Sequence, residues 1–147
     1  MTRRLAGFFP VSILADNMKD HLMTLPLHVL PTRLAICRLP PDAVLPSWAG
    51  GPFVSTTRTD NELSVVCAEA SIPEDIAANR GWRALAVSGP LDFSLTGVLA
   101  SLAGPLAAAG VSIFAISTYD TDYLLVKASD LPKAAETLSA AGHSVIL

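Results

Sequence analysis

Two segments of this chain, sixty residues apart, resemble each other without a gap. Residues 53–66 read FVSTTRTDNELSVV and residues 113–126 read IFAISTYDTDYLLV, so that Asp60 falls on Asp120 and Glu62 on Asp122. Each segment has an alternating stretch, a polar turn with acidic residues and a second apolar stretch, which is the pattern of a β-hairpin. We therefore predict two hairpins, and their recurrence at this spacing indicates a duplicated unit.

The composition supplies enough apolar material for a packed interior. Hydrophobic residues make up 51% of the 147 residues and charged residues only 16%, which excludes a disordered chain. The net charge of -3 and the pI of about 5.5 argue against nucleic acid as a partner, because such proteins carry a basic face. We expect one ordinary domain or two small ones that share a core.

A long uncharged stretch raises the question of a membrane span. No charged residue lies between Asp92 and Asp120, a length sufficient to cross a bilayer. Glycines interrupt the stretch, its periodicity changes from helical to alternating after Gly110, and no basic residue flanks it closely. We therefore predict a buried helix followed by a buried strand, in a cytoplasmic protein without a membrane partner.

The N-terminal residues have some features of a signal peptide. Arg3 and Arg4 precede an apolar run, but Pro10 interrupts that run and Ile13 stands where a small residue is required. A new apolar segment, which looks like the start of a domain, begins at Met23. We interpret residues 1–22 as a loose extension or an over-called start, residues 23–80 as a first unit and residues 81–147 as a second.

The pattern predicts strands in both units and helices mainly in the second. In the first unit we expect strands over 27–39 (bent at Pro31), 53–58 and 63–68, a short helix over 72–79 and at most one helical turn over 42–48. In the second we expect strands over 82–88, 111–118, 123–128 and 144–147, and helices over 98–110 and 131–141. The second unit thus has the order β-α-β-β-α-β of a ferredoxin-like sandwich. The first has the same order with both helices shortened, so the predicted fold class is α+β.

From about Leu25 onward the chain resembles the ACT-domain family of small-molecule-binding regulatory modules. The residues that carry the resemblance are Leu91–Gly97 (LDFSLTG), the helix after them, and Val111–Lys127 (VSIFAISTYDTDYLLVK). More narrowly, the chain is similar to short bacterial proteins with two ACT repeats. The resemblance implies two ferredoxin-like repeats with sheets side by side, and an amino-acid site at the interface between repeats.

The chemistry of the second unit is compatible with such a site. The loop over residues 89–97 leads into a helix N-terminus, where free backbone N–H groups and the helix dipole favour a carboxylate. Asp122, at the start of a strand, offers a negative charge to an ammonium group. Carried over by position, the resemblance implies that the carboxylate end is held by Ser94, Leu95, Thr96 and Gly97, and the amino end or side chain by Thr118, Tyr119 and Asp122. Turn chemistry alone also explains Thr118 and Tyr119, and Asp92 is alternatively a helix or turn cap.

No set of residues predicts an enzyme. The histidines are scattered, and neither a nucleophile elbow nor a phosphate-binding glycine loop occurs. Asp120 and Asp122 are too few for a calcium loop, so we expect no cofactor and no metal. Cys37 and Cys67 lie in apolar runs, and we interpret them as buried thiols, with a disulfide as the alternative.

Taken together, these patterns predict a non-catalytic regulatory protein that senses an amino acid. The expected partners are the amino acid itself and either a second copy of the chain or a regulated enzyme. The alternative is a ligand-free interaction module that pairs through its sheet edges.

Overall fold

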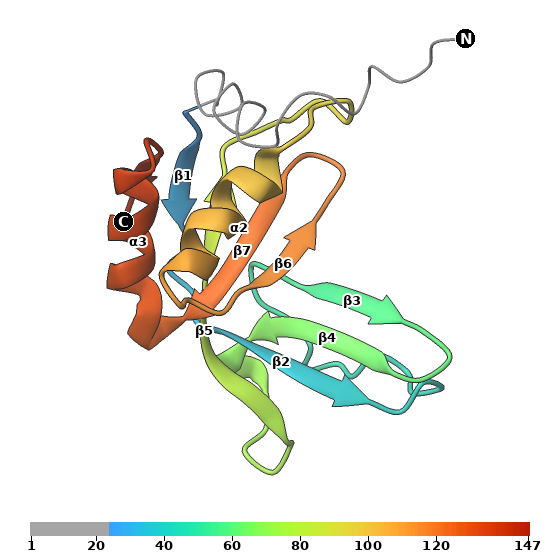
Figure 1. Ribbon diagram of the computed structural model, residues 1–147. Helices are drawn as coiled ribbons and strands as arrows, with labels where there is room; N and C mark the ends of the chain where they lie inside the picture. Colours follow the sequence, from blue (N-terminus) through green and yellow to red (C-terminus); the bar gives the residue numbers. More distant parts are fainter. Residues whose placement is uncertain (1–23) are drawn as a thin grey trace, which may run out of the picture.

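The computed structural model describes residues 24–147 (Figure 1). The extension over residues 1–22 lies outside the described residues, so its separation from the fold stays a prediction. The structure has eight strands, two α-helices and two short 3₁₀ turns: β1 (Pro26–Val29), β2 (Leu34–Leu39), β3 (Ser55–Arg58), β4 (Leu63–Ala68), η1 (Glu69–Ser71), β5 (Ala78–Val87), α2 (Val98–Ala108), β6 (Phe114–Ser117), β7 (Asp122–Lys127), η2 (Ala128–Asp130), α3 (Leu131–Ala140) and β8 (Ser144–Ile146).

The eight strands form one sheet that is organised around β5. The first part of β5 pairs with β2, where Ala78 lies opposite Cys37, and β2 continues the sheet through β4 to β3. The last part of β5 lies between β1 and β7. In Figure 1 the β2–β4–β3 part diverges from the rest of the sheet at β5. A boundary between residues 80 and 81 therefore falls inside a strand that both halves share.

The second half has the predicted β-α-β-β-α-β order, in β5, α2, β6, β7, α3 and β8. Both helices cover the same face of the sheet (Figure 1). Beneath them lies a core of leucines and valines that includes Leu85, Leu102, Leu124 and Leu138, all fully buried. β1 lies between β5 and β8, antiparallel to the first and parallel to the second. The structure is thus an α+β fold with a mixed sheet and two helices.

The first half contains no α-helix within its described residues, which corrects the predicted order. The helix predicted over residues 72–79 is wrong, because residues 72–77 are irregular and β5 already begins at Ala78. Residues 42–48 form only turns. Ile72 and Ile76 are used instead to cover the face of β2 and β4 that bears Cys37 and Cys67. A helix of eight residues is marginal in isolation, so this packing outweighs the helix-start signals of the sequence.

Both predicted hairpins are present and lie in one continuous sheet. β3 pairs with β4 and β6 with β7, each across a four-residue turn. In the first turn Thr59 N–H donates to the Glu62 carbonyl at 2.9 Å, and in the second Thr118 N–H donates to the Thr121 carbonyl at 2.8 Å. Thr118 thus corresponds to Thr59, so the two hairpins are 59 residues apart in the sequence rather than 60. The 3₁₀ turns that begin at Glu69 and Ala128 repeat the same spacing.

The two cysteines match their interpretation as buried thiols. Cys37 and Cys67 are free, buried thiols on one side of the β2–β4 pair. Burial raises the pKa of both thiols. No helix within residues 24–147 is long and apolar enough to span a bilayer.

Candidate ligand pocket

A cleft of about 340 Å³ lies between the loop that leads into α2 and the turn that joins β6 to β7. In Figure 1 these two loops lie at the same end of the molecule. The lining residues come from two short segments: Leu91, Asp92, Phe93, Leu95, Gly97, Val98 and Leu99 from the first, and Ser117, Thr118, Tyr119, Asp120, Thr121 and Asp122 from the second. All of them belong to the second half of the chain.

Backbone contacts hold the two sides of the cleft together. Leu91 N–H donates to the Asp120 carbonyl at 2.7 Å, and the Thr121 hydroxyl donates to the Val87 carbonyl at 2.6 Å. Gly89 makes this approach possible, because a Cβ atom there would lie 3.0 Å from the Asp120 oxygen and 3.1 Å from Thr121 Cβ. The loop and the turn therefore form one connected unit.

The N-terminus of α2 opens into this cleft. Gly97, with a φ of 83°, stands at the N-cap position, and no side chain of the described residues caps the helix there. No acidic residue lies in the first turn. The first-turn N–H groups and the positive end of the helix dipole are therefore open to an anionic group from a ligand.

Acidic residues lie on both sides of the cleft, Asp92 in the loop before α2 and Asp122 after the β6–β7 turn. The Ser117 hydroxyl donates to the Asp122 carboxylate at 2.6 Å, which fixes that carboxylate at the first residue of β7. Asp92 accepts hydrogen bonds from the Ser94 hydroxyl at 2.7 Å and the Ser94 N–H at 2.8 Å. These bonds lower the pKa of the Asp92 carboxyl, so it stays ionised.

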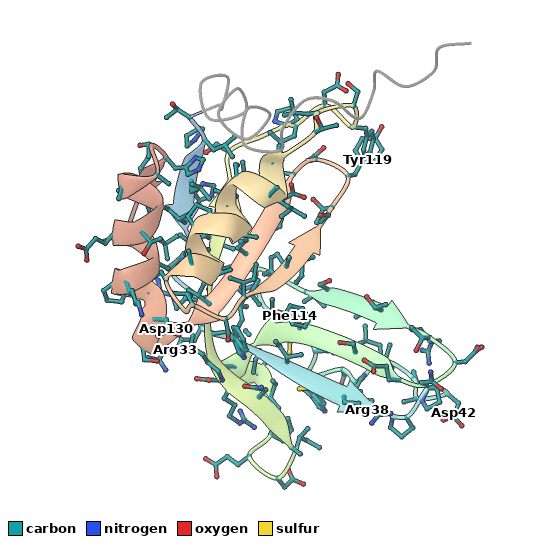
Figure 2. The ribbon with its side chains drawn as sticks, in the orientation of Figure 1. Arg33, Arg38, Asp42, Phe114, Tyr119 and Asp130 are labelled. Carbon is teal, nitrogen blue, oxygen red and sulfur yellow. The ribbon has the colours of Figure 1, made fainter. Side chains whose placement is uncertain are left out.

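Two aromatic rings stand at the rim of the cleft. Phe93 and Tyr119 meet edge to face, with ring centroids 4.9 Å apart and planes at 87°. Both rings remain open to solvent, with 73% of Phe93 and 80% of Tyr119 exposed. Figure 2 shows Tyr119 at the outer end of the β6–β7 turn, directed away from the sheet.

The structure brings most of the predicted site residues together. Leu95, Gly97, Thr118, Tyr119 and Asp122 line the cleft. Ser94 and Thr96 lie in the same loop but do not line it.

Other lining residues were not predicted. The sequence interpretation passed over Phe93 and considered Asp120 only as a turn residue and a possible metal ligand. An aromatic residue within a turn-rich loop was the available signal for Phe93.

A second cleft, of about 320 Å³, separates β3 from β6. The described residues that line it are uncharged and rich in hydroxyl groups, with Thr57 and Ser64 on one side and Ile116 and Ser117 on the other. It lacks charged groups to hold a zwitterion. Elsewhere in the described part of the chain, no three His, Cys, Asp or Glu side chains gather in a group that could hold a metal ion.

Comparisons with known proteins identify the class of domain in the second half of the chain. The ACT-domain model matches residues 77–140, and a model of an N-terminal domain matches residues 33–75. Residues 77–140 of this chain thus form an ACT domain.

Solved structures show the same architecture. A protein from Agrobacterium tumefaciens is 43% identical, with a TM-score of 0.81 over 86% of this chain and 95% of that one. The regulatory subunit of aspartate kinase from Thermus flavus is 11% identical, with a TM-score of 0.56 over 78% of this chain and 95% of that one. The second likeness is one of fold alone.

Curated relatives carry a functional name. The cytosolic arginine sensor for mTORC1 subunit 1 from Bos taurus is 31% identical over 61% of this chain and 32% of its own length. The human protein of the same name is 41% identical over 39% of this chain and 18% of its own length. This chain thus spans a third or less of the length of these relatives.

Proposed function

We propose that this chain is a non-catalytic regulatory protein that binds an α-amino acid in the cleft between the α2 loop and the β6–β7 turn. The observation that carries the proposal is the placement of an uncapped helix N-terminus opposite the Asp122 carboxylate, within one cleft of about 340 Å³. An α-amino acid presents a carboxylate and an ammonium group a short distance apart. The two sides of the cleft offer partners of the opposite sign.

Each end of the ligand has a partner of a definite kind. The carboxylate is bound by the first-turn N–H groups of α2, to which Gly97 and the preceding loop give access. The ammonium group is bound by Asp122, which Ser117 holds in place. Thr118 offers no free hydroxyl proton to the ligand, because its hydroxyl already donates to the Thr121 carbonyl at 3.1 Å.

The names of the relatives support the same class of ligand. A curated relative is called a cytosolic arginine sensor, so binding of a free amino acid in the cytoplasm is a known role of a similar protein. We extend that role and that location to this chain as part of the proposal. The site residues all lie within residues 81–147, and we assign residues 23–80 the role of a scaffold that supports β5.

The open cleft also suggests how a signal is passed on. Among the described residues, the cleft is lined by the second half alone, so an interface between ACT repeats at this site needs a further repeat, for which we propose another copy of the chain or a regulated enzyme. The ligand would then stabilise the assembled form by binding across the interface.

A thermal shift assay against the twenty amino acids tests the proposal. An amino acid supplied at a hundred times its dissociation constant should raise the stability by about 2.7 kcal/mol. If none of the twenty shifts the melting temperature at millimolar concentration, the amino-acid function is overturned. The edges of β3 and β6, which pair on one side only among the described strands, would then favour the second candidate, an interaction module without a ligand.

A further inference from the structure

We propose that the amino acid bound here has a positively charged side chain, which Asp120 and the Phe93–Tyr119 pair recognise. This inference rests on the proposed function, because it assigns the side chain of a ligand that is held in the same cleft. It assigns side-chain recognition to Asp120, Phe93 and Tyr119. Binding of the carboxylate and ammonium groups of the ligand does not require these three residues.

The charge of the cleft is the first argument. Among the described residues that line it, three are aspartates, and none is a lysine, an arginine or a histidine. One carboxylate is sufficient for the ammonium group of an amino acid. The cleft therefore has more negative charge than a ligand with a neutral side chain can balance, and a cationic side chain is favoured.

The hydrogen bonds of the three aspartates separate their roles. Asp92 is bonded to Ser94 and Asp122 to Ser117. Asp120 is exposed in the turn, and among the described residues its backbone carbonyl is bonded to Leu91, with no bond to its carboxylate. Asp120 is therefore the carboxylate that remains available for a second cation.

The aromatic pair is an independent argument. An edge-to-face pair leaves one ring face uncovered, and both rings are largely exposed beside Asp120. A guanidinium or ammonium group is attracted to such a face within about 6 Å of the ring centroid. The same chain contains one such contact already, since Lys127 Nζ lies 4.7 Å from the centroid of the Trp82 ring. An aromatic face next to a free carboxylate is thus suited to a cationic side chain.

Calorimetry with matched ligands tests the assignment. L-Arginine and L-lysine are compared with L-citrulline and L-norleucine, which have similar length and no side-chain charge. We expect the cationic pair to bind about tenfold or more tightly than the neutral pair. The advantage should fall as salt is added, because the exposed carboxylate is screened.

Substitutions in the cleft test which residues recognise the charge of the ligand side chain. Asp120→Asn should lower the arginine affinity about tenfold and leave the citrulline affinity unchanged, and Tyr119→Ala should act in the same direction. Asp60→Asn is the matched control, because it removes one charge from the turn of the other hairpin, outside the cleft. It should change neither affinity.

The outcomes separate this inference from the function on which it rests. If citrulline or norleucine binds as tightly as arginine, the cationic side chain is overturned and the amino-acid site stands. An equal loss of arginine and citrulline binding in Asp120→Asn would remove Asp120 from side-chain recognition. If no amino acid binds, both proposals fall together.

Discussion

At the scale of single residues, Pro105 and His143 depend on each other. Pro105 lies inside α2 and has no N–H, so the carbonyl of Ser101, four residues earlier, has no intrahelical donor. The buried His143 ring replaces that donor, with Nε2 3.3 Å from the Ser101 carbonyl. Its Nδ1 accepts the Leu25 N–H at 3.2 Å. The sequence placed Pro105 in a helix, but it did not predict which residue would make the proline tolerable.

We predict that His143→Ala lowers the free energy of unfolding by about 2–3 kcal/mol, because two buried backbone groups lose their partner. In a Pro105→Ala background the same change should cost about 1 kcal/mol less, because the alanine introduced there supplies the missing N–H. Urea unfolding of the four proteins measures this coupling. Equal costs of the histidine change in both backgrounds would show that the two sites are independent.

The buried thiols predict a loss of stability at alkaline pH. Burial raises the pKa of Cys37 and Cys67 above the ordinary value of 9.0, so the folded state favours the protonated thiol. Their contribution to stability is present below pH 9 and is lost as the pH rises through the folded-state values. The stability of the wild type should therefore fall more between pH 8 and pH 10.5 than that of Cys37→Ala/Cys67→Ala, as measured by urea unfolding. Parallel pH profiles would contradict this prediction.

At the scale of elements, α2 has two glycines with opposite roles. Gly97 begins the helix with a φ of 83°, a conformation that other residues rarely adopt. Gly104 lies exposed inside the helix, and no atom would come within 4 Å of an added Cβ. The first glycine is required by backbone geometry at the cleft, and the second is not.

We predict that Gly104→Ala stabilises the protein by about 0.5–1 kcal/mol and leaves ligand binding unchanged. Gly97→Ala should destabilise it by about 1 kcal/mol or more and weaken binding, since the helix N-terminus shifts. Thermal unfolding and titration of both variants check the pair. A stabilising Gly97→Ala would mean that this backbone position is not strained.

The elements also show how far the sequence could predict the structure. Alternation and turn residues predicted both hairpins, and helical spacing predicted α2 and α3. The sequence comparison gave a spacing of 60 residues between the hairpins, whereas the structure gives 59. The difference arose because the comparison aligned the acidic residues of the two turns and not Thr59 with Thr118. Their hydroxyls each accept an N–H within the turn, from Glu62 at 3.3 Å and from Thr121 at 3.3 Å, and mark the first turn residue.

At the scale of the whole molecule, β5 explains what local patterns missed. Its ten residues serve both halves, so residues 78–81 are strand because β2 pairs with them, not because of their own sequence. The insertion of β1 between β5 and β8 is likewise a long-range pairing. Such pairings depend on tertiary packing, which local propensity does not contain. Most of the predicted cleft residues came from the family resemblance, which places them by position in the loop before α2 and in the β6–β7 turn.

The N-terminal extension carries a prediction at this scale. Because the apolar pattern of the repeats starts at Met23, removal of residues 1–22 should leave the melting temperature nearly unchanged. Thermal unfolding of the full and shortened chains measures this. A drop of about ten degrees or more would correspond to a loss of at least 1–2 kcal/mol and would place the segment in the core.

The central claim, an amino-acid site at the start of β7, is tested most directly by titration calorimetry of Asp122→Asn. Asparagine can still accept the Ser117 hydroxyl, so folding should be little affected, whereas the charge-assisted bond to the ligand ammonium is lost. We expect the cognate amino acid to bind Asp122→Asn about 1.5–3 kcal/mol more weakly than the wild type, with Asp60→Asn unchanged. Equal affinities for the wild type and Asp122→Asn would contradict the account and remove Asp122 from the site.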